Sequence, residues 1–278
     1  MAGSRSRQGR WAGIAVPQRL GRGLMFLVLL GLGFLVVRVP VPFFILAPGV
    51  VKTAAEMVAI EGPVIEPADG QGQFLVTTLA AHPANLGHLF MAALDRDRQV
   101  IARNRLLPPG VELDQYMDEN RELMRQSQLY AIAAAFEYAG RPAELHGSGA
   151  EVRRVLPGMA AAGLVEVGDL IVAVDGEPVV LAPDMDGYME RRGLGRSVSL
   201  RIVRDGASRD VMLELRPGID AGAAAKFLGP ELWRPLGLDV WTRDLTLNLL
   251  DDTEVTIEAG EIAGPSAGLI LALEIVNR

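Results

Sequence analysis

The stretch that decides the fold of the middle of the chain is GSGAEVRRVLPGMAAAGLVEVGDLIVAVDGEPV, residues 147–179. It predicts short strands that end at Pro-Gly and Asp-Gly turns, with a small-residue turn of helix, MAAAG, between the first two. The pattern continues to residue 217, because apolar side chains alternate on either side of a second Asp-Gly turn. The predicted strands are 150–156, 170–174, 197–203 and 211–215, and the predicted helix is 183–192. Residues 144–217 are therefore expected to form a half-open, β-rich barrel with two helices.

The same stretch resembles a bacterial PDZ domain. The residues in register with that family are Pro157, Gly158, Ala161, Gly163, Leu164, Gly168, Asp169, Ile171, Asp175 and Gly176, whereas Met159 and Ala160 replace its usual Ser-Pro. The resemblance implies that the domain captures an extended peptide by strand addition. The implied peptide-binding residues are Ser148, Gly149, Ala150, Glu151 and Val152. The alternative is that residues 146–149 form only a flexible entry loop.

A second motif, GPSAG at residues 264–268, precedes an apolar segment at 269–276. One interpretation is structural, with Ser266 capping the free amides of a buried helix. A nucleophile elbow also fits G-x-S-x-G, but it needs a histidine further along the chain, and every histidine precedes the motif. That interpretation fails. The third is a Ser-Lys dyad, in which Ser266 at a helix N-terminus is the nucleophile and a lysine is its base.

The segment EIAGPSAGLILALEI, residues 261–275, resembles the active-site segment of the Lon-type proteases. With a PDZ module and an apolar N-terminus, the chain resembles the membrane-anchored, PDZ-containing Lon-like proteases, which lack the ATPase part of Lon. The segment SQLYAIAAAFEYAG, residues 127–140, stands where that family has a Ser-Gln-rich helix. The resemblance implies an ATP-independent serine endopeptidase that acts on exported peptides or unfolded proteins. Ser266 would be its nucleophile, and no cofactor or nucleotide is implied.

The base of the implied dyad is not evident in the chain. In the family that the chain resembles, the lysine follows the serine by a few dozen residues, so the resemblance implies a lysine beyond Arg278 and a truncated, inactive chain. The lysines present are Lys52 and Lys226, and both precede Ser266. A natural stop at Arg278 is the alternative, and it would make the protein a non-catalytic, peptide-binding membrane adaptor.

The N-terminus predicts a membrane anchor. Residues 1–22 contain arginines and no acidic residue, and residues 24–37 are uncharged and apolar. Because the apolar run resumes after Arg38, residues 23–47 are expected to form one transmembrane helix, for which about 20 residues suffice. A cleaved signal peptide is the alternative, although no small-x-small cleavage site follows. The arginines would keep the N-terminus cytoplasmic and place the PDZ and protease parts outside the cell membrane.

The expected fold class is α+β: a transmembrane helix, a PDZ domain, and then the N-terminal part of a Lon-type α/β protease domain. The expected segments are a cytoplasmic tail at 1–22, the anchor at 23–47, an exported α+β segment at 48–143 with a long helix at 115–139, the PDZ domain at 144–217 and a partial protease domain at 218–278. The chain has no cysteine, which excludes thiol catalysis and disulfides. Its net charge of −7 argues against a nucleic-acid partner. No metal site is expected, because no second histidine or carboxylate has metal-site spacing with His146.

Overall fold

The computed structural model describes residues 18–62, 72–108, 110–192, 197–214, 232–233 and 236–278. The arginines at positions 5, 7 and 10 and the predicted start of the protease segment, including Lys226, lie outside these residues. The chain divides into two compact units. The first contains the residues up to Ala47 together with Ala81–Ile101, and the second contains Pro48–Ala80 and Ala102–Arg278.

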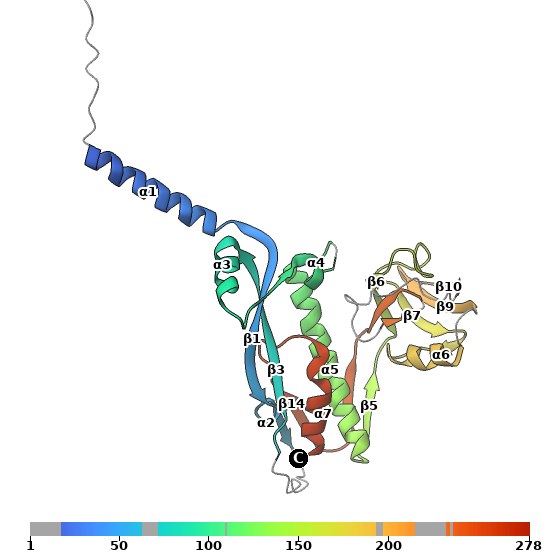
Figure 1. The fold of residues 1–278 in the computed structure, drawn as a ribbon. Helices are drawn as coiled ribbons and strands as arrows, with labels where there is room; N and C mark the ends of the chain where they lie inside the picture. The colour runs from blue at the N-terminus through green and yellow to red at the C-terminus, as the bar shows by residue number, and fades with distance from the viewer. Residues whose placement is uncertain (1–17, 63–71, 109, 193–196, 215–231, 234–235) are drawn as a thin grey trace, which may run out of the picture. The chain divides into compact units, whose positions relative to one another are not determined.

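The first unit begins with helix α1, Gln18–Val37, and continues into strand β1, Pro40–Thr53 (Figure 1). The helix predicted at 23–47 was therefore too long, because α1 ends at Val37 and residues 40–47 are extended. Pro40 and Pro42 explain the end of the helix, since proline lacks an amide hydrogen and disfavours a helical residue before it. Ile45 is buried against Ala84 and Ala92. Among the residues that the structure describes, no helix is both long and apolar enough to cross a membrane.

Strands β3, Leu75–Asn85, and β4, Gln99–Ala102, form a three-stranded sheet with β1 in the order β3-β1-β4. The helix α3, Leu86–Leu94, was not predicted. It begins after Asn85, whose side-chain oxygen accepts a hydrogen bond of 2.8 Å from the amide of His88 and so caps the helix. Two single-turn helices, α2 at Ala54–Met57 and α4 at Arg103–Leu106, belong to the second unit.

The second unit is built around the long helix α5, Leu113–Tyr138, which is present where the sequence predicted residues 115–139. The C-terminal helix α7, Gly268–Val276, packs along α5 (Figure 1). Two short strand pairs accompany them: β5, Ala143–His146, with β13, Thr246–Leu249, and β2, Val58–Glu61, with β14, Glu254–Ile257. Leu271 of α7 is fully buried in the shared core, against Met124 and Phe136 of α5 among others.

The β-rich module is a seven-stranded sheet in the order β10-β9-β7-β6-β12-β11, with β8 paired to β7. The strands are β6, Ala150–Val155; β7, Leu170–Val174; β8, Glu177–Pro178; β9, Ser197–Arg204; β10, Ala207–Glu214; β11, Leu232–Trp233; and β12, Leu238–Thr242. Helix α6, Asp184–Arg192, lies where the sequence predicted it. The expected turn of helix at MAAAG is instead a series of tight turns.

Strand β12 extends the sheet beyond residue 217, the predicted end of the module. Leu236, Leu238 and Val240 have no exposed surface and belong to the same core as Val152 and Ile171. A segment that the sequence assigned to the protease part thus completes the core of the β-rich module. The chain then runs from β12 through β13 and β14 to the serine motif.

Candidate functional site

Ser266 lies in a single 3-10 turn, η1, Pro265–Ala267, directly before α7. The turn begins at Gly264, whose φ of 97° is in the region that glycine adopts at little cost. Its amide donates a hydrogen bond of 2.9 Å to the carbonyl oxygen of Asn120 in α5. Ser266 itself is exposed, and among the described residues its hydroxyl has no hydrogen-bond partner. The side chain is therefore not used as a helix cap, and it stands free at the positive end of the α7 dipole.

Helix α5 supports the serine turn through a second contact. The hydroxyl of Ser127 donates a hydrogen bond of 2.9 Å to the carbonyl oxygen of Pro265. Gly268 approaches the same side chain so closely that a Cβ there would lie 2.3 Å from Ser127 Oγ. The small residues of the GPSAG motif therefore allow the serine turn to sit directly on α5.

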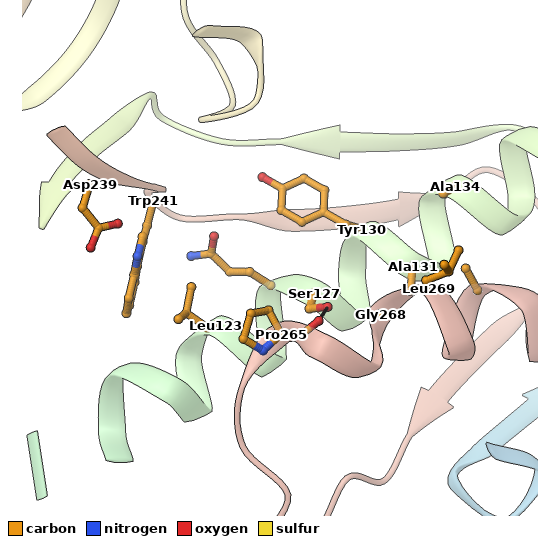
Figure 2. Close-up of a pocket in the computed structure, with 12 residues that line it drawn as sticks. Leu123, Ser127, Tyr130, Ala131, Ala134, Asp239, Trp241, Pro265, Gly268 and Leu269 are labelled. Carbon is orange, nitrogen blue, oxygen red and sulfur yellow. Dashed lines mark hydrogen bonds between the residues drawn. The ribbon is translucent and has the colours of Figure 1, made fainter. Parts of the chain in front are cut away.

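An apolar cleft of about 320 Å³ lies beside the turn. Figure 2 shows side chains from α5, from β12 and from the serine turn facing it. Its lining residues are Leu123, Gln126, Ser127, Tyr130, Ala131, Ala134, Asp239, Trp241, Pro265, Gly268, Leu269 and Ala272. Because the lining includes several small and apolar residues, the cleft has room for an apolar side chain of a peptide bound near Ser266.

Asp239 is a buried carboxylate at the edge of this cleft. Burial raises its pKa above the usual 3.8, and the nearby Glu119 acts in the same direction, although Arg154 partly opposes them. One guanidinium nitrogen of Arg154 lies 3.3 Å from Asp239, and another lies 3.3 Å from Glu119. Arg154 thus joins β6, β12 and α5 through two ion pairs.

The residues predicted to bind peptide lie together at the start of β6, but both edges of this strand are already paired. On one side, Ala150 and Glu151 pair with Ile171 and Leu170 of β7. On the other side, Ala150, Glu151 and Val152 pair with Thr242, Trp241 and Val240 of β12. A peptide could add to β6 only by displacing one of these strands.

The predicted entry loop is also held by the chain. The amide of Ser148 donates to the carbonyl of Arg243 at 2.9 Å, and the amide of Arg243 donates to the carbonyl of Gly149 at 3.0 Å. The Ser148 hydroxyl donates to the Asp244 carboxylate at 3.0 Å. Strand β12 is also covered: β11 pairs with Leu238 and Asp239, and all five residues of β12 are buried.

Neither lysine is shown beside Ser266. Lys52, in β1, is half-buried near Gly260, where a Cβ would lie 3.5 Å from its Nζ. Lys226 lies outside the described residues. In the part of the chain that the structure describes, no group of three or more His, Asp or Glu side chains could hold a metal ion.

The sequence interpretation missed β12 and the side chains that it brings to the cleft, Asp239 and Trp241. The apolar alternation of Leu236, Leu238 and Val240 was the signal that could have revealed the strand. Its pairing partner could not have been inferred, because β6 precedes it by more than 80 residues.

Comparison with known proteins identifies the β-rich module. The PDZ domain family matches residues 136–203. A Geobacillus thermodenitrificans protein solved in solution is 36% identical over 25% of this chain and 79% of its own, with a TM-score of 0.24. The PDZ domains of SdrC-like proteins from Listeria monocytogenes and Listeria innocua are 19% and 21% identical, each over 33% of this chain, covering 86% and 91% of their own chains, with TM-scores of 0.27.

No match to this chain was found among the curated proteins. The family match nevertheless shows that the chain carries a PDZ domain, as the residues from Pro157 to Gly176 indicated. A PDZ domain implies peptide binding or a role in protein interaction.

Proposed function

We propose that the protein is an ATP-independent, membrane-anchored serine endopeptidase of the Lon-like type, with Ser266 as its nucleophile. The observation that carries the proposal is the position of Ser266: an exposed hydroxyl at the N-terminus of helix α7, beside an apolar cleft. The resemblance of GPSAG to the Lon-type active-site segment supports it. The PDZ domain would present exported peptides or unfolded segments to this serine.

The chemistry needs a base. Ser266 Oγ would attack the carbonyl carbon of the scissile peptide bond while its proton passes to a neutral lysine amine. The lysine would then protonate the leaving amine, and water would hydrolyse the acyl-enzyme. The positive end of the α7 dipole would stabilise the oxyanion. In the family that the chain resembles, this lysine follows the serine by a few dozen residues.

The peptide would lie along the cleft beside the serine turn rather than against β6. Both edges of β6 are paired, one with β7 and the other with β12. The cleft is lined by Trp241 of β12 and by Pro265, which directly precedes Ser266. An apolar residue of the substrate would then occupy the cleft.

In this proposal the N-terminal segment that contains α1 attaches the protein to the membrane. Its described apolar side chains from Met25 to Val37 are between 46% and 65% exposed, which is unfavourable in water and expected for a helix in lipid. The arginines of residues 1–22 support a cytoplasmic N-terminus. Protease added to intact spheroplasts should digest the PDZ domain, whereas protection of that domain would reverse the topology.

A non-catalytic peptide-binding adaptor is the second candidate. It is favoured by one observation: among the described residues, the Ser266 hydroxyl has no base within hydrogen-bond reach. The two candidates differ in one experiment. The protein, expressed with whatever residues follow Arg278 in its gene, would be incubated with an unfolded protein without ATP, and the products would be analysed by mass spectrometry. Cleavage supports the peptidase, and peptide binding without cleavage supports the adaptor.

A further inference from the structure

We propose that α5 couples the PDZ sheet to the Ser266 turn, with Thr242 as the contact on the PDZ side and Ser127 as the contact on the serine side. The coupling would make the position of Ser266 depend on the state of β12, the strand that pairs with β6. The proposal rests on the proposed function only for its consequence in catalysis. The mechanical link itself stands on contacts within the second unit.

Thr242, the last residue of β12, is only 2% exposed, and it connects the PDZ sheet to α5. Its hydroxyl oxygen lies 2.7 Å from the Tyr130 hydroxyl and accepts a hydrogen bond of 2.8 Å from the amide of Ala182, which precedes α6. Its carbonyl oxygen accepts a hydrogen bond of 3.0 Å from the side-chain amide of Gln126. Since Thr242 also pairs with Ala150 of β6, one buried residue joins the sheet, the α6 loop and α5.

The opposite contact is made within the same turn of α5. Ser127 follows Gln126 directly, and successive residues of a helix point about 100° apart. Gln126 therefore reaches β12 while Ser127 reaches the carbonyl of Pro265, the residue before Ser266. About two turns further towards the N-terminus, the carbonyl of Asn120 accepts a hydrogen bond from the amide of Gly264.

The rigidity of α5 makes these contacts interdependent. Gln126 holds the PDZ strand, and Ser127 holds the turn that carries Ser266. A peptide that shifts β12 at Thr242 moves Gln126 and Tyr130, and Ser127 moves with them. Thr242 is accordingly a positioning residue, because it acts on Ser266 through α5.

The chain contains no cysteine, which permits a direct test. In a Ser266→Cys variant, the rate of thiol alkylation and the hydrogen exchange of residues 264–268 report the state of the turn without any catalytic base. Adding Thr242→Val keeps the shape of the side chain but removes both hydroxyl contacts. Loss of hydrogen bonds of ordinary strength should raise the alkylation rate and the exchange of the turn by about threefold to tenfold. Ser127→Ala should act in the same direction.

Thr246→Val is the matched control, because Thr246 is exposed on β13, and it should leave both measurements unchanged. If Ser127→Ala alters the turn and Thr242→Val does not, α5 supports the turn without coupling it to the PDZ sheet, and the proposal is overturned. If thermal melting shows that Thr242→Val does not fold, Gln126→Met decides the question, since it removes the other donor to Thr242 and retains a side chain of similar length. An unchanged turn in that variant likewise overturns the proposal.

The outcome is separable from the proposed function. If Thr242→Val alters the turn but the protein has no peptidase activity, the coupling through α5 is supported and the proposed peptidase function is rejected. If the protein has peptidase activity but Thr242→Val leaves the turn unchanged, the proposed function is supported and the coupling is overturned.

Discussion

The hydroxyl of Ser127 and the carbonyl oxygen of Pro265 are separated by 138 residues in the sequence and joined by a hydrogen bond of 2.9 Å. The bond places the turn that carries Ser266 on the middle of α5. Gln126, the neighbour of Ser127, binds the last strand of the PDZ sheet. A single helix thus contacts both parts of the molecule to which the proposed function assigns a role.

The close contact between Gly268 and Ser127 predicts that substitutions at these two positions have non-additive effects on the free energy of unfolding. A Gly268→Ala variant would place its Cβ 2.3 Å from Ser127 Oγ, and this overpacking should cost about 1–3 kcal/mol in the free energy of unfolding. Adding Ser127→Ala should recover part of the loss, because the nearest remaining side-chain atom, Ser127 Cβ, is 3.7 Å away. A double-mutant cycle in urea measures this. Simple additivity of the two changes would contradict the predicted contact.

Asp169 predicts an acid-sensitive PDZ domain. Burial raises its pKa, but hydrogen bonds from Arg204 and from the Glu166 amide outweigh burial and hold the pKa below its usual value of 3.8. Since the folded-state pKa is lowered, the stabilisation is present above about pH 4 and is lost as the pH falls through the folded-state value. Asp169→Asn should cost about 3 kcal/mol at pH 7, because it leaves Arg204 without its buried partner.

The test for Asp169 is denaturant unfolding as a function of pH. The difference between the wild-type protein and Asp169→Asn should shrink below pH 4. Asp210→Asn is the control, because the Asp210–Arg201 pair is exposed, and it should change stability by less than about 1 kcal/mol. A difference for Asp169→Asn that is equal at pH 3 and pH 7 would contradict the assignment.

Asp239 predicts the opposite pH dependence. Burial is the main cause of its raised pKa, so its contribution to stability is present below about pH 4 and is lost as the pH rises through the folded-state value. Each unit by which the pKa is raised corresponds to about 1.4 kcal/mol at a pH above both values. Asp239→Asn should therefore gain stability relative to the wild-type protein between pH 4 and pH 7. Unfolding curves at the two pH values check this, and a relative loss over that interval would count against a desolvated carboxylate.

The role of β12 in the PDZ core predicts a large cost for its side chains. Leu238 has no exposed surface, so Leu238→Ala should lower the free energy of unfolding by about 2–5 kcal/mol. Leu164, which is 49% exposed in the same domain, supplies the matched control, and Leu164→Ala should cost less than about 1 kcal/mol. Equal costs for the two variants would mean that β12 is not part of the core.

The sequence predicted those features whose causes are local. The PDZ turns, the hairpin at Asp205-Gly206 and the helix α5 follow from turn residues and from periodicity, and each is present. The helix expected to run to Ala47 failed because the apolar run was counted across Pro40 and Pro42. The pairing of β6 with β12 and the hydrogen bond from Ser127 to Pro265 join residues that are far apart in the sequence. No local pattern specifies a partner at such a separation.

The central claim, that Ser266 is the nucleophile of a peptidase, is tested most directly by one substitution. The protein, expressed as its gene encodes it, would be assayed for cleavage of an unfolded protein without ATP. Ser266→Ala should reduce the rate by at least about a thousandfold, because removal of a nucleophile eliminates covalent catalysis. Ser208→Ala, at an exposed serine of β10, should leave the rate unchanged. Cleavage by Ser266→Ala at the rate of the unsubstituted protein would contradict the account.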